Sequence, residues 1–182
     1  YELALEAKAL EPSLPAVYEA LGNVSLFHRK HDEAVAAARQ WVRVEPGNAD
    51  AYANLAGALH FSGDHDDVIP LVDKAMRLNP YYPFYYLLYR GQALLAMERY
   101  QEAIEAIDRS VSRNPDALPP HIYRASCLAH LGREDDARVA LADVRRIVPA
   151  ISADWVKTIF AYKEASDMDR LIGGLRRAGL SE

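Results

Sequence analysis

The sequence contains a single cysteine, Cys127, among its 182 residues. One thiol excludes a disulfide within the chain, and no Cys or His pair has the spacing of a structural zinc site. An acidic run surrounds His65, but acidic residues at the start of a helix explain it better than a cation site does. We therefore expect no metal and no cofactor, and we expect a reducing compartment, the cytoplasm.

Long uncharged apolar runs are also missing, so no segment of the sequence is expected to span a membrane. The net charge is -5, from 26 acidic and 21 basic residues that are well interspersed. Such a surface has no positive field to attract phosphate backbones, which argues against a nucleic acid as partner. Apolar residues make up 51% of the chain, enough for a well-ordered helical core.

Catalytic patterns are absent as well. The sequence has no Ser-His-Asp arrangement, no glycine-rich phosphate loop and no paired general acid and base. The pair Gly173-Gly174 is isolated and does not indicate a nucleotide-binding site. Without such a pattern, we predict that this chain is not itself an enzyme. Strand signals are also absent, so we predict an all-α fold.

What the sequence does contain is an internal repeat. Prolines that end helices recur at spacings of 34, 34, 35 and 34 residues, at Pro12, Pro46, Pro80, Pro115 and Pro149. A small residue recurs at one place in each unit, where two helices must approach closely, at Gly22, Ala56, Gly91 and Ala125.

Each unit splits into two helical patterns joined by a turn. Gly63 and Gly132 supply permissive backbone at two of these turns. Acidic pairs such as Asp32-Glu33 and Asp66-Asp67 follow the turns, which predicts that they lie in the first turn of the second helix, where carboxylates complement the helix dipole.

These residues resemble tetratricopeptide repeats, through the Y-x-x-L-G phrase at Tyr18, Leu21 and Gly22, the later Ala34 and the proline at a 34-residue period. The resemblance covers nearly the whole chain. It implies a right-handed superhelix, an α-α solenoid of stacked antiparallel helix pairs, with a concave groove lined by the first helix of each pair.

We accordingly treat residues 1–182 as one repeat domain. Its expected parts are the second helix of a truncated repeat at 1–14, repeats at 15–48, 49–83, 84–117 and 118–151, and a C-terminal capping helix pair at 152–182.

The two ends differ. The first helix is expected to have no partner helix, so we predict an apolar flank near Leu3, Leu5 and Leu10 and a longer parent protein. The segment after Pro149 is atypical, as a terminal unit with a polar outer face should be. The extra residue at Tyr81–Pro83 is expected to alter the stacking locally.

A second resemblance concerns the stretches beginning LNPYYPFYYLLYRG and SDMDRLIGGLRRAG. They are similar to the C-terminal repeat regions of bacterial class III adenylate or guanylate cyclases. This resemblance implies a parent that makes a cyclic nucleotide, with the repeats sensing or anchoring. The cyclase chemistry itself would lie outside this chain.

The repeat register places a set of side chains on the concave face, namely Glu19, Asn23, Phe27, Asn54, His60, Tyr85, Tyr89, Gln92, Tyr123 and Ser126. Tyrosine suits a peptide-binding surface because it offers a large contact area and a hydroxyl. The alternative is that some of these tyrosines pack against the next repeat. Chaperone-type relatives clamp a terminal carboxylate with cations, but the matching places here carry Glu19, Tyr85 and Tyr89, so this clamp is broken.

Arg90 and Arg124 occupy equivalent places in successive units. They could form an anion site, but we favour pairing of each arginine with an acidic residue such as Glu98, Glu105 or Asp108, because a half-buried arginine normally finds a carboxylate.

The sequence thus predicts a scaffold that binds a protein or peptide in its groove, as the regulatory or anchoring part of a larger bacterial signalling protein. The alternative is a self-association module, a homodimer that brings two copies of the parent enzyme together.

Overall fold

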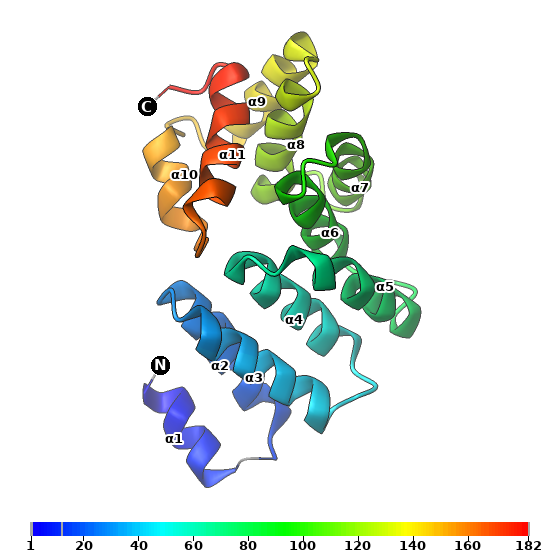
Figure 1. The fold of residues 1–182 in the computed structure, drawn as a ribbon, viewed down its shortest axis with the longest axis vertical. Coiled ribbons are helices and arrows are strands. Elements are labelled where there is room, and N and C mark those ends of the chain that lie inside the picture. The colour runs from blue at the N-terminus through cyan, green and yellow to red at the C-terminus, as the bar shows by residue number, and fades with distance from the viewer. Residues whose placement is uncertain (1, 12, 182) are drawn as a thin grey trace. The chain divides into compact units, whose positions relative to one another are not determined.

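The computed structural model describes residues 2–11 and 13–181, with the side chain of Lys8 left out. Tyr1, Pro12 and Glu182 lie outside the described residues, and so does the helix-ending role expected of Pro12. No strand occurs in the described part of the chain. The elements are α1 (Glu2–Leu10), α2 (Pro15–Phe27), α3 (His31–Val44), α4 (Ala49–Ser62), the short 3-10 helix η1 (His65–Asp67), α5 (Val68–Leu78), α6 (Phe84–Ala96), α7 (Tyr100–Arg113), α8 (Leu118–His130), α9 (Glu134–Ile147), α10 (Ala153–Ile159) and α11 (Ala165–Arg177) (Figure 1).

The four described repeat prolines end helices as predicted. α3, α5, α7 and α9 each stop two residues before one of them, at Pro46, Pro80, Pro115 and Pro149. The residue before a proline is driven out of the helical region by the ring, which explains the repeated stop.

The chain divides into two compact units. Unit 1 comprises residues 1–82 with 161–163, and unit 2 comprises residues 83–160 with 164–182. The division falls within the Tyr81–Pro83 segment, where the sequence carries its one-residue insertion.

In unit 1, α2 pairs with α3 and α4 pairs with α5, while α3 and α2 both pack against α4. Tyr18, Trp41 and Ala51 form one core cluster. Val17 and Leu21 belong to another, against which α1 packs with alanines on one of its faces. Because burial of such apolar area drives helix association, α1 is held as one layer of the repeat array.

In unit 2, α6 pairs with α7, α8 pairs with α9, and α7 packs against α8. α11 packs against α8 and reaches α6, and α10 packs against α11. A Cβ atom on Gly91 would lie 2.4 Å from Cγ1 of Ile107. The small residue predicted at this position is thus required for the close approach of α6 and α7.

Each turn inside a repeat has one residue with positive φ. Gly63 (φ 92°) and Gly132 (φ 73°) take this conformation as expected, but Arg29 (φ 56°) and Glu98 (φ 61°) take it in the other two repeats. The left-handed residue closes the helix C-terminus, since Gly63 N–H donates to His60 O at 3.2 Å.

The acidic pairs follow the prediction only in part. Asp32 and Glu33 lie in the first turn of α3, but Asp66 and Asp67 lie in η1, before α5 begins. The expectation for this second pair was wrong because Pro70 has no N–H, so the α-helical hydrogen bond to the Asp66 carbonyl cannot form.

Candidate protein-binding site

The face of α2 and α4 that the repeat register assigns to the groove is called here the first-helix face of unit 1, and its predicted members are Glu19, Asn23, Phe27, Asn54 and His60. α2 and α4 pack side by side, and Asn54 Nδ2 donates to Asn23 Oδ1 at 3.2 Å. A Cβ atom on Gly22 would lie 3.1 Å from Asn54 Oδ1. The absence of a side chain at Gly22 therefore leaves room for the amide pair that joins the two helices. Glu19 and Asn23 are exposed.

Phe27 ends α2 and is 84% exposed. Its ring meets that of His28 edge-on, with the centroids 5.7 Å apart. Phe61 lies 34 residues later, at the equivalent place near the end of α4. An aromatic ring left as open as that of Phe27 is the strongest apolar contact that the face can offer to another molecule.

The equivalent ring, Phe61, is partly buried beside a non-helical piece of the same unit, residues 161–163. Lys163 N–H donates to Phe61 O at 2.9 Å, and His31 Nε2 contacts Ala161 O at 2.6 Å, which makes that ring nitrogen the donor. Tyr162 packs its ring 5.2 Å from that of Phe61. Lys163 Nζ also pairs with Asp32 Oδ1 at 3.0 Å. Unit 1 thus holds a short non-helical segment through both its main chain and its side chains.

His60 lies beside this segment and is fully buried. Its Nε2 atom lies 3.2 Å from the Tyr162 hydroxyl, and its Nδ1 atom has no hydrogen-bond partner among the described residues. Burial, and then the neighbouring His65, hold the pKa of His60 well below its usual value. His60 was expected to face a partner; in the structure its ring is instead a neutral support for Tyr162.

The corresponding first-helix face of unit 2 carries the predicted residues Tyr85, Tyr89, Gln92, Tyr123 and Ser126. Tyr85 and Tyr89 are partly exposed and lie edge to face, with ring centroids 6.0 Å apart. Desolvation raises the pKa of the Tyr89 hydroxyl. The two tyrosines form an aromatic patch at one end of this face.

The other three predicted residues of unit 2 are buried. Two of them meet the C-terminal segment: Ser126 Oγ donates to Leu171 O of α11 at 3.0 Å, and the Tyr123 ring meets Phe160 edge-on at 5.2 Å. Gln92 is 1% exposed. The sequence reasoning placed these residues in an open groove because it did not foresee that α11 would lie on α8. The signal it missed is Gly174, which was considered only as a nucleotide-binding residue.

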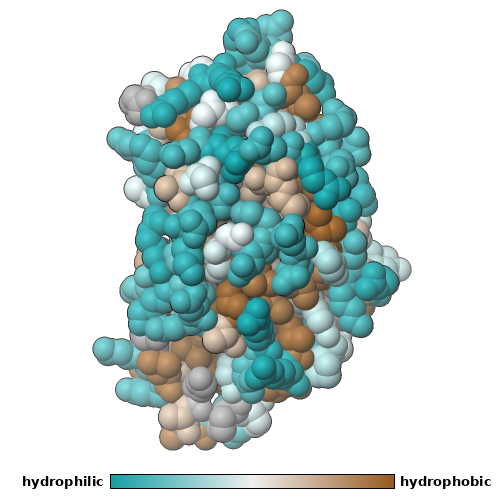
Figure 2. Space-filling model, in the orientation of Figure 1, coloured by the Kyte–Doolittle hydropathy of each residue, from teal (hydrophilic) through white to brown (hydrophobic). Residues whose placement is uncertain are grey.

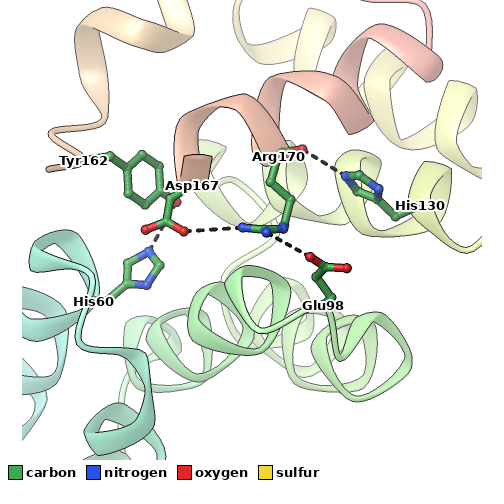
Figure 3. A network of polar contacts seen from close by, with 6 residues as sticks. All are labelled: His60, Glu98, His130, Tyr162, Asp167 and Arg170. Carbon is green, nitrogen blue, oxygen red and sulfur yellow. Dashed lines mark hydrogen bonds and ion pairs between the residues drawn. The ribbon is translucent and has the colours of Figure 1, made fainter. Parts of the chain in front are cut away.

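α11 is fixed by a small polar network within unit 2 (Figure 3). The Arg170 guanidinium lies between two carboxylates, 2.9 Å from Glu98 Oε1 and 3.4 Å from Asp167 Oδ1. His130 Nε2 lies 2.9 Å from the Arg170 carbonyl, and the His130 ring stacks on Tyr100 with a centroid distance of 4.6 Å. The network joins α11 to the end of α8 and to the turn after α6.

One of the two equivalent arginines has a direct carboxylate partner on α7. Arg124 Nε pairs with Asp108 Oδ1 at 2.7 Å, as the favoured interpretation predicted. Arg90 contributes to the lowered pKa of Glu102, after the larger effect of the Arg99 hydrogen bond. The favoured interpretation, an arginine paired with an acidic residue, is thus confirmed for Arg124.

Within the described ranges, no group of three or more His, Cys, Asp and Glu side chains could hold a metal ion. The same residues include no helix long and apolar enough to cross a bilayer.

Comparison with known families identifies the repeat. The model of the tetratricopeptide repeat matches residues 19–83 and 88–149. The chain belongs to the tetratricopeptide-repeat family. Proteins with this fold are helical scaffolds for protein and peptide partners rather than catalysts. The cyclase resemblance is not supported by this match.

A curated relative, small glutamine-rich tetratricopeptide repeat-containing protein 2 of Mycosarcoma maydis, is 29% identical over 97 residues. The match covers 53% of this chain and 27% of the relative, so it spans only about a quarter of that protein.

Solved structures share the fold at low identity. PilW, a type IV pilus biogenesis factor, superposes with a TM-score of 0.74 at 18% identity, covering 96% of this chain and 78% of its own. The tetratricopeptide-repeat protein TTC0263 of Thermus thermophilus gives 0.71 at 18% identity, with 96% and 88% covered. YrrB, described as a repeat protein with an unusual peptide-binding site, gives 0.61 at 18% identity, with 96% and 90% covered. These neighbours are tetratricopeptide-repeat solenoids, as the sequence predicted for this chain.

Proposed function

We propose that this chain is a protein-interaction scaffold that binds an extended segment of a partner on the first-helix face of unit 1. The observation that carries the proposal is the seat of residues 161–163. There, His31 and the Phe61 carbonyl hold a non-helical segment by its main chain. The same unit offers an equivalent aromatic ring, Phe27, which is largely exposed and has its edge-on contact with the adjacent His28.

The chemistry of this face suits a peptide. The amide groups of Asn23 and Asn54 are held at a fixed spacing by their mutual hydrogen bond, and each keeps further donor and acceptor capacity for a peptide main chain. Phe27 adds apolar area of the kind that dominates binding energy at interfaces. Glu19 is the acidic member of the face and favours a segment with a cation rather than a free carboxylate.

A peptide library displayed on phage tests this proposal with a defined probe. Selected peptides are measured by fluorescence anisotropy against the intact chain and against the variants Phe27→Ala and Asn54→Ala. We expect each substitution to weaken binding about tenfold or more, because hot-spot side chains contribute roughly 2 kcal/mol or more each.

Arg39→Ala serves as the matched control, because Arg39 is exposed on α3, the second helix of its repeat. Selected peptides that lose affinity for Arg39→Ala but not for Phe27→Ala would place binding elsewhere. A library that yields no binder at micromolar concentration would also count against the proposal.

Self-association is a second candidate, favoured by the apolar side of α1. Leu3 is 80% and Leu10 is 85% exposed, as the sequence predicted for this flank, and Figure 2 shows hydrophobic surface over α1. Exposed leucines on one short helix are a natural contact between copies. Sedimentation velocity of the intact chain should show concentration-dependent association that the double variant Leu3→Lys, Leu10→Lys abolishes. Identical monomeric profiles for both chains would remove this candidate.

The place of the module in a larger bacterial signalling protein, such as an adenylate cyclase, and in the cytoplasm, is also part of the proposal. Its support is the similarity of two stretches, those beginning LNPYYPFYYLLYRG and SDMDRLIGGLRRAG, to cyclase repeat regions. The proposal assigns no catalysis to this chain, so an assay of the chain with ATP or GTP should yield no cyclic nucleotide.

A further inference from the structure

The first-helix face of unit 2 already holds a helix. α11 lies against α8 and reaches α6, and it buries Leu171, Ile172 and Leu175 to 2% exposure or less. The repeat register assigns this face to partner binding. On that assignment, α11 occupies the position of a bound ligand, although it belongs to the same chain.

Gly174 sets how deeply this helix sits. A Cβ atom there would lie 2.2 Å from Ser126 Oγ, 2.6 Å from Ser126 O and 2.8 Å from Ser126 Cα. Two of these atoms belong to the backbone of α8 and cannot move aside. The seat therefore accepts glycine alone at this point of a bound helix.

The groove side chains recognise α11 mainly by its main chain. Ser126 Oγ donates to the Leu171 carbonyl at 3.0 Å and His130 Nε2 donates to the Arg170 carbonyl at 2.9 Å. The stacked ring of Tyr100 orients His130 for this contact. Such contacts do not depend on which side chain a helix carries at those two positions.

One side chain adds sequence selectivity. Arg170 reaches Glu98 at 2.9 Å (Figure 3). It lies one helical turn before Gly174 on α11. The pattern Arg-x-x-x-Gly on one helix therefore matches both the acidic rim and the glycine seat of this face.

Gln92 lies on α6, a helix that α11 also reaches. This residue occupies on α6 the place that Ser126 occupies on α8, 34 residues later. It is 1% exposed, and its Oε1 atom has no hydrogen-bond partner among the described residues. A buried acceptor left unpaired costs free energy in the folded chain.

We propose that α11 is a reversible ligand of the first-helix face of unit 2 and that its release opens this face to a partner helix. The partner is a single amphipathic helix with Arg and Gly four residues apart and a hydrogen-bond donor placed to reach Gln92. This inference concerns unit 2 and does not depend on peptide binding by unit 1.

Amide hydrogen exchange of the intact chain tests the release. α11 should exchange at least about tenfold faster than α8, because it opens without unfolding the repeats. Gln92→Leu, which removes the unpaired acceptor, should slow exchange in α11 by about tenfold, and Arg170→Ala should accelerate it by about tenfold. Arg177→Ala, at an exposed position of the same helix, should leave it unchanged.

A labelled synthetic peptide of residues 164–181 tests the groove as a binding site. It should bind the full chain carrying Gly174→Leu, whose own helix is ejected, at least about tenfold more tightly than the wild-type chain, where it must compete. The same peptide carrying Gly174→Leu should bind neither chain. Far-UV circular dichroism establishes that the Gly174→Leu chain keeps its repeats; if it does not, the exchange experiment decides.

Exchange of α11 and α8 at one common rate that none of the substitutions changes would overturn the proposal. So would failure of the wild-type peptide to bind a folded Gly174→Leu chain. Loss of library-peptide binding to unit 1 bears only on the proposed function, so the two proposals fail separately.

Discussion

At the scale of single residues, two turns of the repeats hold a residue other than glycine in the left-handed conformation, which costs free energy. Arg29 has a φ of 56°, whereas the corresponding residues Gly63 and Gly132 are glycines. A side chain in this left-handed conformation costs roughly 1 kcal/mol. Arg29 also reaches the Tyr162 carbonyl at 3.5 Å, so its substitution has two effects that must be separated.

Arg29→Gly is therefore predicted to be about 1 kcal/mol more stable to unfolding than Arg29→Ala, because both lose the side chain and only glycine relieves the backbone. Urea denaturation of the two variants gives this difference directly. Equal midpoints and equal slopes would show that the turn is not strained.

Cys127 provides a second test at this scale. Its thiol is completely buried, and burial, with Asp108 nearby, raises its pKa far above the usual range. Only the thiolate reacts with Ellman's reagent, so labelling in the native chain should proceed no faster than opening of unit 2. The exposed variant Ser13→Cys should label a second thiol at once; equally fast labelling of both would contradict the buried placement.

At the scale of elements, the packing of α6 on α7 depends on the missing side chain of Gly91. Gly91→Ala would drive a methyl group into Ile107, 2.4 Å away, and should cost about 1–3 kcal/mol. Ile107→Ala should cost about 2–5 kcal/mol by itself. The double variant should be less destabilised than the sum, because the space vacated by Ile107 accepts the new methyl. Strict additivity in chemical denaturation would show that these two helices do not meet as described.

The repeated elements could be predicted because their signals are local. The prolines after α3, α5, α7 and α9 and the small residue at Gly91 act within one repeat, and each behaves as expected. The start of α5 could not be placed from the acidic pair because Pro70 removes a hydrogen bond that the general rule assumes. The sequence predicted a helix in the region of α11, but it did not predict that this helix packs against α8.

At the scale of the whole molecule, the long-range contacts are what the sequence could not supply. Ser126 meets Leu171, 45 residues later, and His60 meets Tyr162, 102 residues later. No periodicity links such pairs, because the contacting segments belong to different kinds of structure: a repeat helix on one side, and the C-terminal segment on the other. The repeat register therefore assigned Ser126 and His60 to an open face. In the structure both residues are buried, and each contacts a residue of the C-terminal segment.

The central claim is that partner segments bind the first helices of unit 1. Hydrogen exchange of the intact chain, measured with and without a library-selected peptide, tests it most directly, because it locates the bound surface without any substitution. The account predicts slower exchange in α2 and α4, around Asn23 and Asn54, with α3 and α5 unchanged. Protection confined to α3 and α5, or absent from unit 1, would contradict it.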